Sequence, residues 1–157
     1  MTEPSFFEDF QLTHEFRSGE YRVEADRITA FAAEFDPQPQ HLSEEAAAAS
    51  QFGGLVASGW HTASLAMRLL IEALPSIEGG AMGTGADQLK WARPVRPGDA
   101  LHVIATIVAA RPSASRPDKG LVTCEVAALN QHDQLVLRFL TTMMVPRRPT
   151  KNSSTAS

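Results

Sequence analysis

The chain has 157 residues, of which 43% are hydrophobic and 20% are charged. This length suits one domain whose core folds without disulfides or structural metals, and the composition excludes a disordered or fibrous chain. The net charge of -4 gives no overall attraction to polyanions, which argues against nucleic acid as a partner. Cys124, the only cysteine, cannot form a disulfide within the chain, and no cysteine or histidine spacing is typical of zinc, so we expect no metal.

Two segments bear on the location of the protein. The first ten residues contain acidic side chains and no basic region ahead of an apolar segment, so they do not resemble a secretory signal. The longest apolar stretch, residues 55–74, contains an arginine and a glutamate, which argues against a membrane span. We therefore expect a cytoplasmic protein. Residues 146–157 contain almost no apolar side chains and are expected to form a disordered tail.

The first half of the chain predicts a strand followed by two helices. The strand is expected near residues 19–24. Apolar residues then recur at helical spacing through residues 27–35. Ser43 is a suitable N-cap for a second, short helix, because the two glutamates after it lie in the first turn, where the helix dipole favours negative charge.

These two predicted helices are joined by the sequence DPQPQHLS, residues 36–43. Each proline disfavours helical backbone at the residue before it, so we expect an extended, stiff segment that carries Asp36 and leads directly to His41. On local grounds alone, a solvated surface turn is the more common role of such a pair. A carboxylate and an imidazole on one rigid loop could instead hold a single water molecule from two sides, as general acid–base catalysis requires.

A long helix is predicted from about Trp60 to Ala73, after two glycine-containing turns and before a proline. Its apolar residues cover every face, so we expect protein to surround most of it. Gly59 stands directly before this helix, where free backbone N–H groups and the positive end of the helix dipole could stabilise an oxyanion. The alternative role of Gly59 is to permit a tight turn.

The second half of the chain changes to the patterns of strands. Alternating or β-branched apolar residues predict strands within residues 87–95, 99–110, 120–130 and 134–145. Short connections between successive strands imply antiparallel pairing. The predicted fold is therefore α+β, with a curled antiparallel sheet of about five strands wrapped around one long central helix.

Three stretches together resemble the MaoC-like acyl dehydratases and (R)-specific enoyl-CoA hydratases, which have the hot-dog fold. The hydratase signature of that family is D-x-N-P-x-H before the central helix. Asp36, Pro39 and His41 match the signature in identity and spacing, whereas Gln38 stands in place of the asparagine. The sequences FGGLVASGWHTASLAMRLL and ARPVRPGDAL are similar to the family's entries to the central helix and to a strand. The resemblance implies a single MaoC-like hot-dog domain over residues 1–145.

The resemblance also implies an activity, the reversible addition of water to a 2-enoyl thioester carried on coenzyme A, without a metal or redox cofactor. Asp36 and His41 would be the catalytic pair. Gly59 would donate its N–H to the thioester oxygen, and Ser64 would help to position the site. For Gly59 and Ser64 the alternative is a purely structural role in a turn and in a packed helix.

Other residues could border an acyl-CoA site. Trp60 suits an apolar wall for the acyl chain. Arg93 and Arg116 are loop cations that could meet the CoA phosphates, although solvated loops explain them equally well. His61, next to Trp60, is expected to be a core histidine hydrogen-bonded to the backbone.

Two other functions remain open for this fold, hydrolysis of an acyl-CoA thioester and non-catalytic binding of an acyl thioester. A curled sheet around one helix has an exposed face and open edges, so self-association is expected. The family resemblance points to a homodimer with each site near the subunit interface. The expected partners are thus an acyl-CoA substrate and a second copy of the chain, with neither nucleic acid nor membrane.

Overall fold

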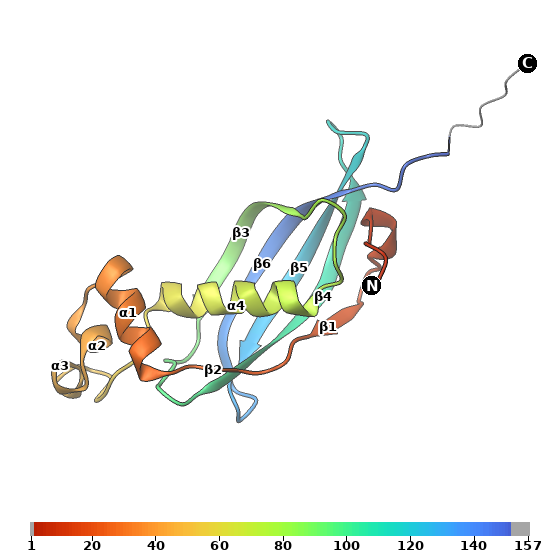
Figure 1. Cartoon of the computed structure of the whole chain (residues 1–157). Helices are drawn as coiled ribbons and strands as arrows, with labels where there is room; N and C mark the ends of the chain where they lie inside the picture. The colour runs from red at the N-terminus through yellow and green to blue at the C-terminus, as the bar shows by residue number, and fades with distance from the viewer. Residues whose placement is uncertain (1, 152–157) are drawn as a thin grey trace, which may run out of the picture.

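The structure, a computed structural model, describes residues 2–151. Its elements in chain order are η1 (Phe7–Asp9), β1 (Glu15–Arg17), β2 (Tyr21–Arg22), α1 (Ala25–Phe35), α2 (Pro39–Leu42), α3 (Glu44–Ala48), α4 (Gly59–Ala73), β3 (Met82–Trp91), β4 (Ala100–Pro112), β5 (Lys119–Leu129) and β6 (Leu135–Pro146). The strands pair antiparallel in one sheet with the order β1-β4-β5-β6-β3, and the two-residue β2 also pairs with β4. Figure 1 shows α4 lying across one face of this sheet. The predicted α+β architecture is confirmed.

The core lies between α4 and the sheet. Burial alternates along β5 with the two-residue period of a strand, so one set of side chains faces α4: Val122, Cys124, Val126 and Ala128. On the other side of this core, α4 contributes three buried leucines, Leu65, Leu69 and Leu70. Cys124 is completely buried, and this burial raises the pKa of its thiol to about 11. Cys124 is therefore a small core residue.

The central helix begins and ends as predicted but is not surrounded. Trp60, Met67 and Ile71 of α4 are 59%, 43% and 58% exposed. The expectation that protein covers most of α4 is therefore wrong for the single chain, because the sheet reaches only one side of the helix. β3 is an edge strand, and most of its residues are exposed. No helix of the described residues is long and apolar enough to cross a membrane.

The three helices α1, α2 and α3 lie together at the end of the sheet where α4 begins (Figure 1). α1 contacts both α2 and α4, and α2 contacts α3. Ser43 is the N-cap of α3, as predicted, and its hydroxyl accepts a hydrogen bond of 3.1 Å from the backbone N–H of Ala46. This packing places the segment between α1 and α3 beside the first turn of α4.

The segment after β6 falls partly within the described residues. Arg147 forms an ion pair of 3.3 Å with Glu8, and Arg148 forms one of 2.7 Å with Asp9, so both arginines contact η1. Residues 152–157 of the predicted tail lie outside the described residues.

Candidate active site

The segment from Asp36 to His41 folds back on itself instead of remaining extended. α1 ends because Asp36 leaves the helical region, with φ -152° and ψ 68°. Gln38 is extended, but Pro39 occupies the first turn of α2, where its missing N–H costs nothing and its fixed φ favours a helix. The N–H of His41 then donates to the carbonyl of Gln38. The predicted stiff extended span is therefore wrong beyond residue 38, and a helical turn brings His41 close to Asp36.

His41 is held in one tautomer by the backbone. Its side chain is buried, and Nδ1 lies 2.7 Å from the carbonyl oxygen of Val56. A carbonyl oxygen can only accept a hydrogen bond, so Nδ1 carries the proton in the neutral ring. Nε2 consequently presents an unshared electron pair, and it lies 3.5 Å from Oδ2 of Asp36. The histidine is thus oriented as a proton acceptor that faces the carboxylate.

The Asp36 carboxylate accepts a hydrogen bond at each oxygen. The amide Nε2 of Gln38 donates to Oδ1 over 2.7 Å, and the hydroxyl of Ser58 donates to Oδ2 over 2.6 Å. These two bonds, the one from Ser58 foremost, hold the pKa of Asp36 below its ordinary value; partial burial opposes them, and positive charge on His41 would add to them. Asp36 is therefore a stable anion in this site.

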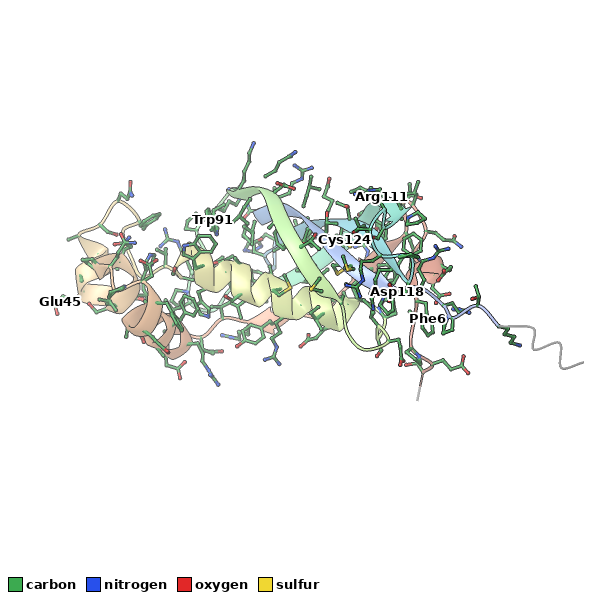
Figure 2. The ribbon with its side chains drawn as sticks, turned by 90° about the horizontal axis from the view of Figure 1, so that it is seen from above. Phe6, Glu45, Trp91, Arg111, Asp118 and Cys124 are labelled. Atoms are coloured by element: carbon green, nitrogen blue, oxygen red, sulfur yellow. The ribbon has the colours of Figure 1, made fainter. Side chains whose placement is uncertain are left out.

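Gly59 begins α4 and lies against an indole ring. Its N–H has no hydrogen-bond acceptor among the described residues, as expected at the first helical position. Its carbonyl accepts a hydrogen bond of 2.7 Å from Nε1 of Trp91. A Cβ atom at this position would come within 2.7 Å of the Trp91 ring, so the close approach of Trp91 requires glycine here. Figure 2 shows Trp91 beside this end of α4.

These groups line a cavity of about 460 Å³ at the start of α4. Its wall combines the polar side chains with apolar and aromatic ones, and its residues are Asp36, Gln38, Gln40, His41, Phe52, Val56, Ala57, Gly59, Trp60, Thr62, Trp91, Ala92, Arg93, Pro94 and Val95. A mostly apolar cavity with a few convergent polar groups is typical of a small-molecule site. Five residues predicted from the sequence meet in it: Asp36, His41, Gly59, Trp60 and Arg93.

Two other predicted site residues lie outside this cavity. Ser64 is exposed, and its hydroxyl donates to the carbonyl of Trp60 over 2.8 Å, one turn back along α4. Arg116 belongs to the connection between β4 and β5, where it forms an ion pair of 3.6 Å with Asp118. In Figure 2, Asp118 is at the opposite end of the molecule from Trp91. In the single chain, neither Ser64 nor Arg116 joins the Asp36 and His41 pair.

His61 is buried, as predicted, but its expected hydrogen bond is not formed. Its ring stacks on Phe31 of α1, with ring centres 4.8 Å apart and ring planes inclined by 9°. Nδ1 is buried without a hydrogen-bond partner among the described residues, and burial lowers the pKa of the ring. His61 therefore packs as a neutral aromatic residue against α1.

Ser58 is the main site residue that the sequence reasoning missed. It is fully buried and is the N-cap of α4, where Oγ accepts a hydrogen bond of 3.3 Å from the N–H of Trp60. A serine directly before the first residue of a predicted helix is a recognisable N-cap pattern. Its second contact, with Asp36, joins residues 22 positions apart and is visible only in the fold.

The chain is similar to known proteins along most of its length. A family model described as "MaoC like domain" matches residues 9–128. The uncharacterized protein YdeM of Bacillus subtilis is 29% identical over 140 residues, which cover 89% of this chain and 98% of YdeM. A crystal structure of the MaoC-like dehydratase from Rhodospirillum rubrum is 51% identical, with a TM-score of 0.86 over 92% of this chain and 99% of that one.

A third similar protein is a hydratase. The (R)-hydratase from A. caviae involved in PHA biosynthesis is 26% identical, with a TM-score of 0.71 over 88% of this chain and 98% of that one. The antiparallel sheet with α4 packed across one face has the hot-dog fold. Since the family model spans well over half of the sequence, the chain belongs to the MaoC-like domain family.

Proposed function

We propose that this protein is an (R)-specific enoyl-CoA hydratase, which reversibly adds water to a 2-enoyl thioester. The observation that carries the proposal is the 3.5 Å approach of two hydrogen-bond acceptors, Asp36 Oδ2 and His41 Nε2, in the wall of a cavity. The similarity to the (R)-hydratase from A. caviae supports the reaction class and the configuration of the 3-hydroxy product.

Two facing acceptors favour a water molecule between them. A water that donates one proton to Oδ2 and the other to Nε2 directs its oxygen lone pairs away from both residues, toward a substrate in the cavity. Hydration then forms a bond from this oxygen to C3, while the catalytic pair takes one proton from the water. A proton from the same pair goes to C2, so the residues return to their starting charge. No redox or metal chemistry is needed for these steps.

After water adds to C3 and before C2 is protonated, negative charge develops on the thioester oxygen. The N–H of Gly59 has no acceptor among the described residues, and it stands at the positive end of the α4 dipole. We assign this N–H as the donor to the thioester oxygen. The loss of one such donor typically costs about 10²- to 10³-fold in rate.

The remaining cavity residues suit the carrier and the acyl group. Trp60 and Trp91 meet edge to face, with ring centres 5.3 Å apart, and both line the cavity. Arg93 is exposed at the same cavity and forms no ion pair or hydrogen bond with other described side chains. Its guanidinium is therefore available for a phosphate of coenzyme A. We assign Ser64 and Arg116 no step in this mechanism, because in the single chain they lie outside the cavity wall.

A second copy of the chain is part of the proposal. The side chains of Trp60, Met67 and Ile71 leave a row of apolar groups on the outer side of α4, and β3 presents an open strand edge. Both features are unfavourable in water and are removed when two copies associate. We therefore propose a homodimer that covers α4 and β3.

The activity is tested with crotonyl-CoA, whose conjugated thioester absorbs ultraviolet light until water is added. The purified protein should remove this absorbance without releasing free thiol. Release of thiol would identify a thioesterase instead. Tight binding of the thioester with neither reaction would identify a binding module.

A further inference from the structure

Ser58 links the start of α4 to the proposed catalytic carboxylate. Its single hydroxyl proton is donated to Asp36 Oδ2 over 2.6 Å, and its oxygen accepts the N–H of Trp60 over 3.3 Å. The side chain is completely buried, so water does not compete for either bond. Because Ser58 both accepts and donates, these two bonds polarise each other and extend the positive end of the helix to the carboxylate.

The requirements of an N-cap do not explain the choice of serine. Aspartate and asparagine cap helices as well as serine does, since a cap needs only an accepting oxygen. An aspartate at position 58 would place a second carboxylate against Asp36 Oδ2 and would repel it. A hydroxyl can satisfy the N–H of Trp60 and still donate a proton to Asp36. The chemistry of this position is therefore matched to an anionic Asp36 as well as to the helix.

The surroundings of Asp36 contain few other charges that could take this role. The cavity wall has three ionisable side chains, Asp36 itself, His41 from α2 and Arg93 from the connection after β3. His61 of α4 stacks on Phe31 of α1 and is not part of the wall. Among the described residues, only Ser58 and Gln38 donate hydrogen bonds to the carboxylate.

We infer that Ser58 is a positioning residue, whose hydroxyl keeps Asp36 ionised and directs Oδ2 toward His41 Nε2, so that both can hold the attacking water. This inference rests on the hydratase activity proposed above. It assigns Ser58 no contact with substrate. Its effect on the reaction passes entirely through Asp36.

The first test measures Asp36 directly and does not depend on activity. Carbon NMR follows the titration of the Asp36 carboxyl group in the wild-type protein, in Ser58→Ala and in Ser58→Thr. The wild-type group should titrate below the ordinary value of about 3.9, Ser58→Ala should raise its pKa, and Ser58→Thr, which keeps the hydroxyl, should restore it. Ser43→Ala is the matched control, because it removes the N-cap hydroxyl of α3 without contact to Asp36.

The second test asks whether Ser58 acts through Asp36. Ser58→Ala should lower kcat for crotonyl-CoA about tenfold to a hundredfold, with little change in KM. Combined with Asp36→Asn, it should cause almost no further loss, because the group that Ser58 positions is already removed. Ser58→Gly repeats the test if the alanine variant does not fold, since glycine is a tolerated N-cap.

The possible outcomes separate the two proposals. An Asp36 that titrates at or above its ordinary value in the wild-type protein overturns the role of Ser58, whichever variants fold. The role of Ser58 is also overturned if Ser58→Ala lowers kcat by the same factor in the wild-type protein and in the Asp36→Asn variant. A lowered wild-type pKa that rises in Ser58→Ala, in a protein that does not hydrate crotonyl-CoA, upholds the positioning of Asp36 and refutes the proposed hydratase.

Discussion

Oδ2 of Asp36 and Nε2 of His41 lie 3.5 Å apart, and neither atom carries a proton that could join them when the histidine is neutral. The carbonyl of Val56 fixes the proton of His41 on Nδ1. Hydrogen bonds from Ser58 and Gln38 keep Asp36 ionised. The family's signature residues thus form a pair of facing acceptors, which is the arrangement that the proposed activation of one water requires.

The tautomer of His41 can be measured in the protein without substrate. We predict that nitrogen NMR of the neutral His41 ring will find the proton on Nδ1, because the carbonyl of Val56 is an acceptor and supplies no donor. A neutral ring that carries its proton on Nε2 would contradict the arrangement described for the water.

Gln38 should support the anionic state of Asp36 in place of the signature asparagine. Gln38→Ala removes the 2.7 Å hydrogen bond to Oδ1, and we predict a higher pKa of Asp36 together with a fall in kcat of roughly tenfold. Gln51→Ala, at an exposed position after α3, is the control. An unchanged Asp36 titration in Gln38→Ala would show that the amide has no such role.

Gly59 should be intolerant of any side chain. In Gly59→Ala the new Cβ would lie 2.7 Å from the Trp91 ring, so either the ring or the helix start must move. We expect the free energy of unfolding to fall by about 1–3 kcal/mol and the hydration rate to fall with the displaced N–H. Urea denaturation and the crotonyl-CoA assay measure these effects. Gly19→Ala is the control, because open space surrounds that position; equal behaviour of the two variants would refute the prediction.

His61 should make the protein less stable in acid. The folded protein holds the pKa of His61 below its ordinary value through burial. Below about pH 6.5 the unfolded chain takes up a proton that the folded chain resists, so the free energy of unfolding decreases as the pH falls toward the folded pKa. His61→Phe keeps an aromatic ring against Phe31 and should reduce this decrease in urea denaturation. Identical pH dependence of wild type and variant would contradict the prediction.

The proposed homodimer depends on the apolar outer side of α4. We predict that the wild-type protein sediments as a dimer at micromolar concentration, and that Ile71→Glu shifts it toward monomer by placing a charge in the contact. Leu12→Glu is the matched control, because Leu12 is an apolar residue outside α4 and β3. The exposed fraction of Leu12 is 59%, and that of Ile71 is 58%. A monomeric wild-type protein would exclude the homodimer.

Local patterns in the sequence predicted α4 and the strands β4, β5 and β6 well, but they did not predict β1, and they placed β3 at residues 87–95 instead of Met82–Trp91. The apolar run and its glycine and proline boundaries predicted α4 to within one residue, and the cap at Ser43 is formed as expected. The course of residues 39–41 was predicted wrongly, because Pro39 was interpreted as a stiffening residue when it begins a helical turn. Both interpretations obey the backbone preferences of proline, and only packing decides between them.

The candidate site was predictable where residue type and spacing carry the information. Asp36 and His41 were proposed from their match to the family's signature, and Gly59 from its place before a helix and from the same resemblance; all three lie in one cavity wall. The contact between Ser58 and Asp36 could not be predicted, because it depends on how α4 meets the end of α1. The exposure of Ser64 likewise depends on which side of α4 the sheet covers, and an apolar pattern on every face of the helix does not reveal that side.

The central claim is that Asp36 and His41 activate water for addition to an enoyl thioester. The most direct measurement compares crotonyl-CoA hydration by the wild-type protein, Asp36→Asn, His41→Ala and His102→Ala. His102 is the matched control, because it faces Asp133 at 3.4 Å in another histidine–aspartate pair that lies outside the cavity wall. We predict a loss of about 10²- to 10⁴-fold in kcat for each of the first two variants and wild-type turnover for the third. Unchanged turnover in both Asp36→Asn and His41→Ala would contradict the claim.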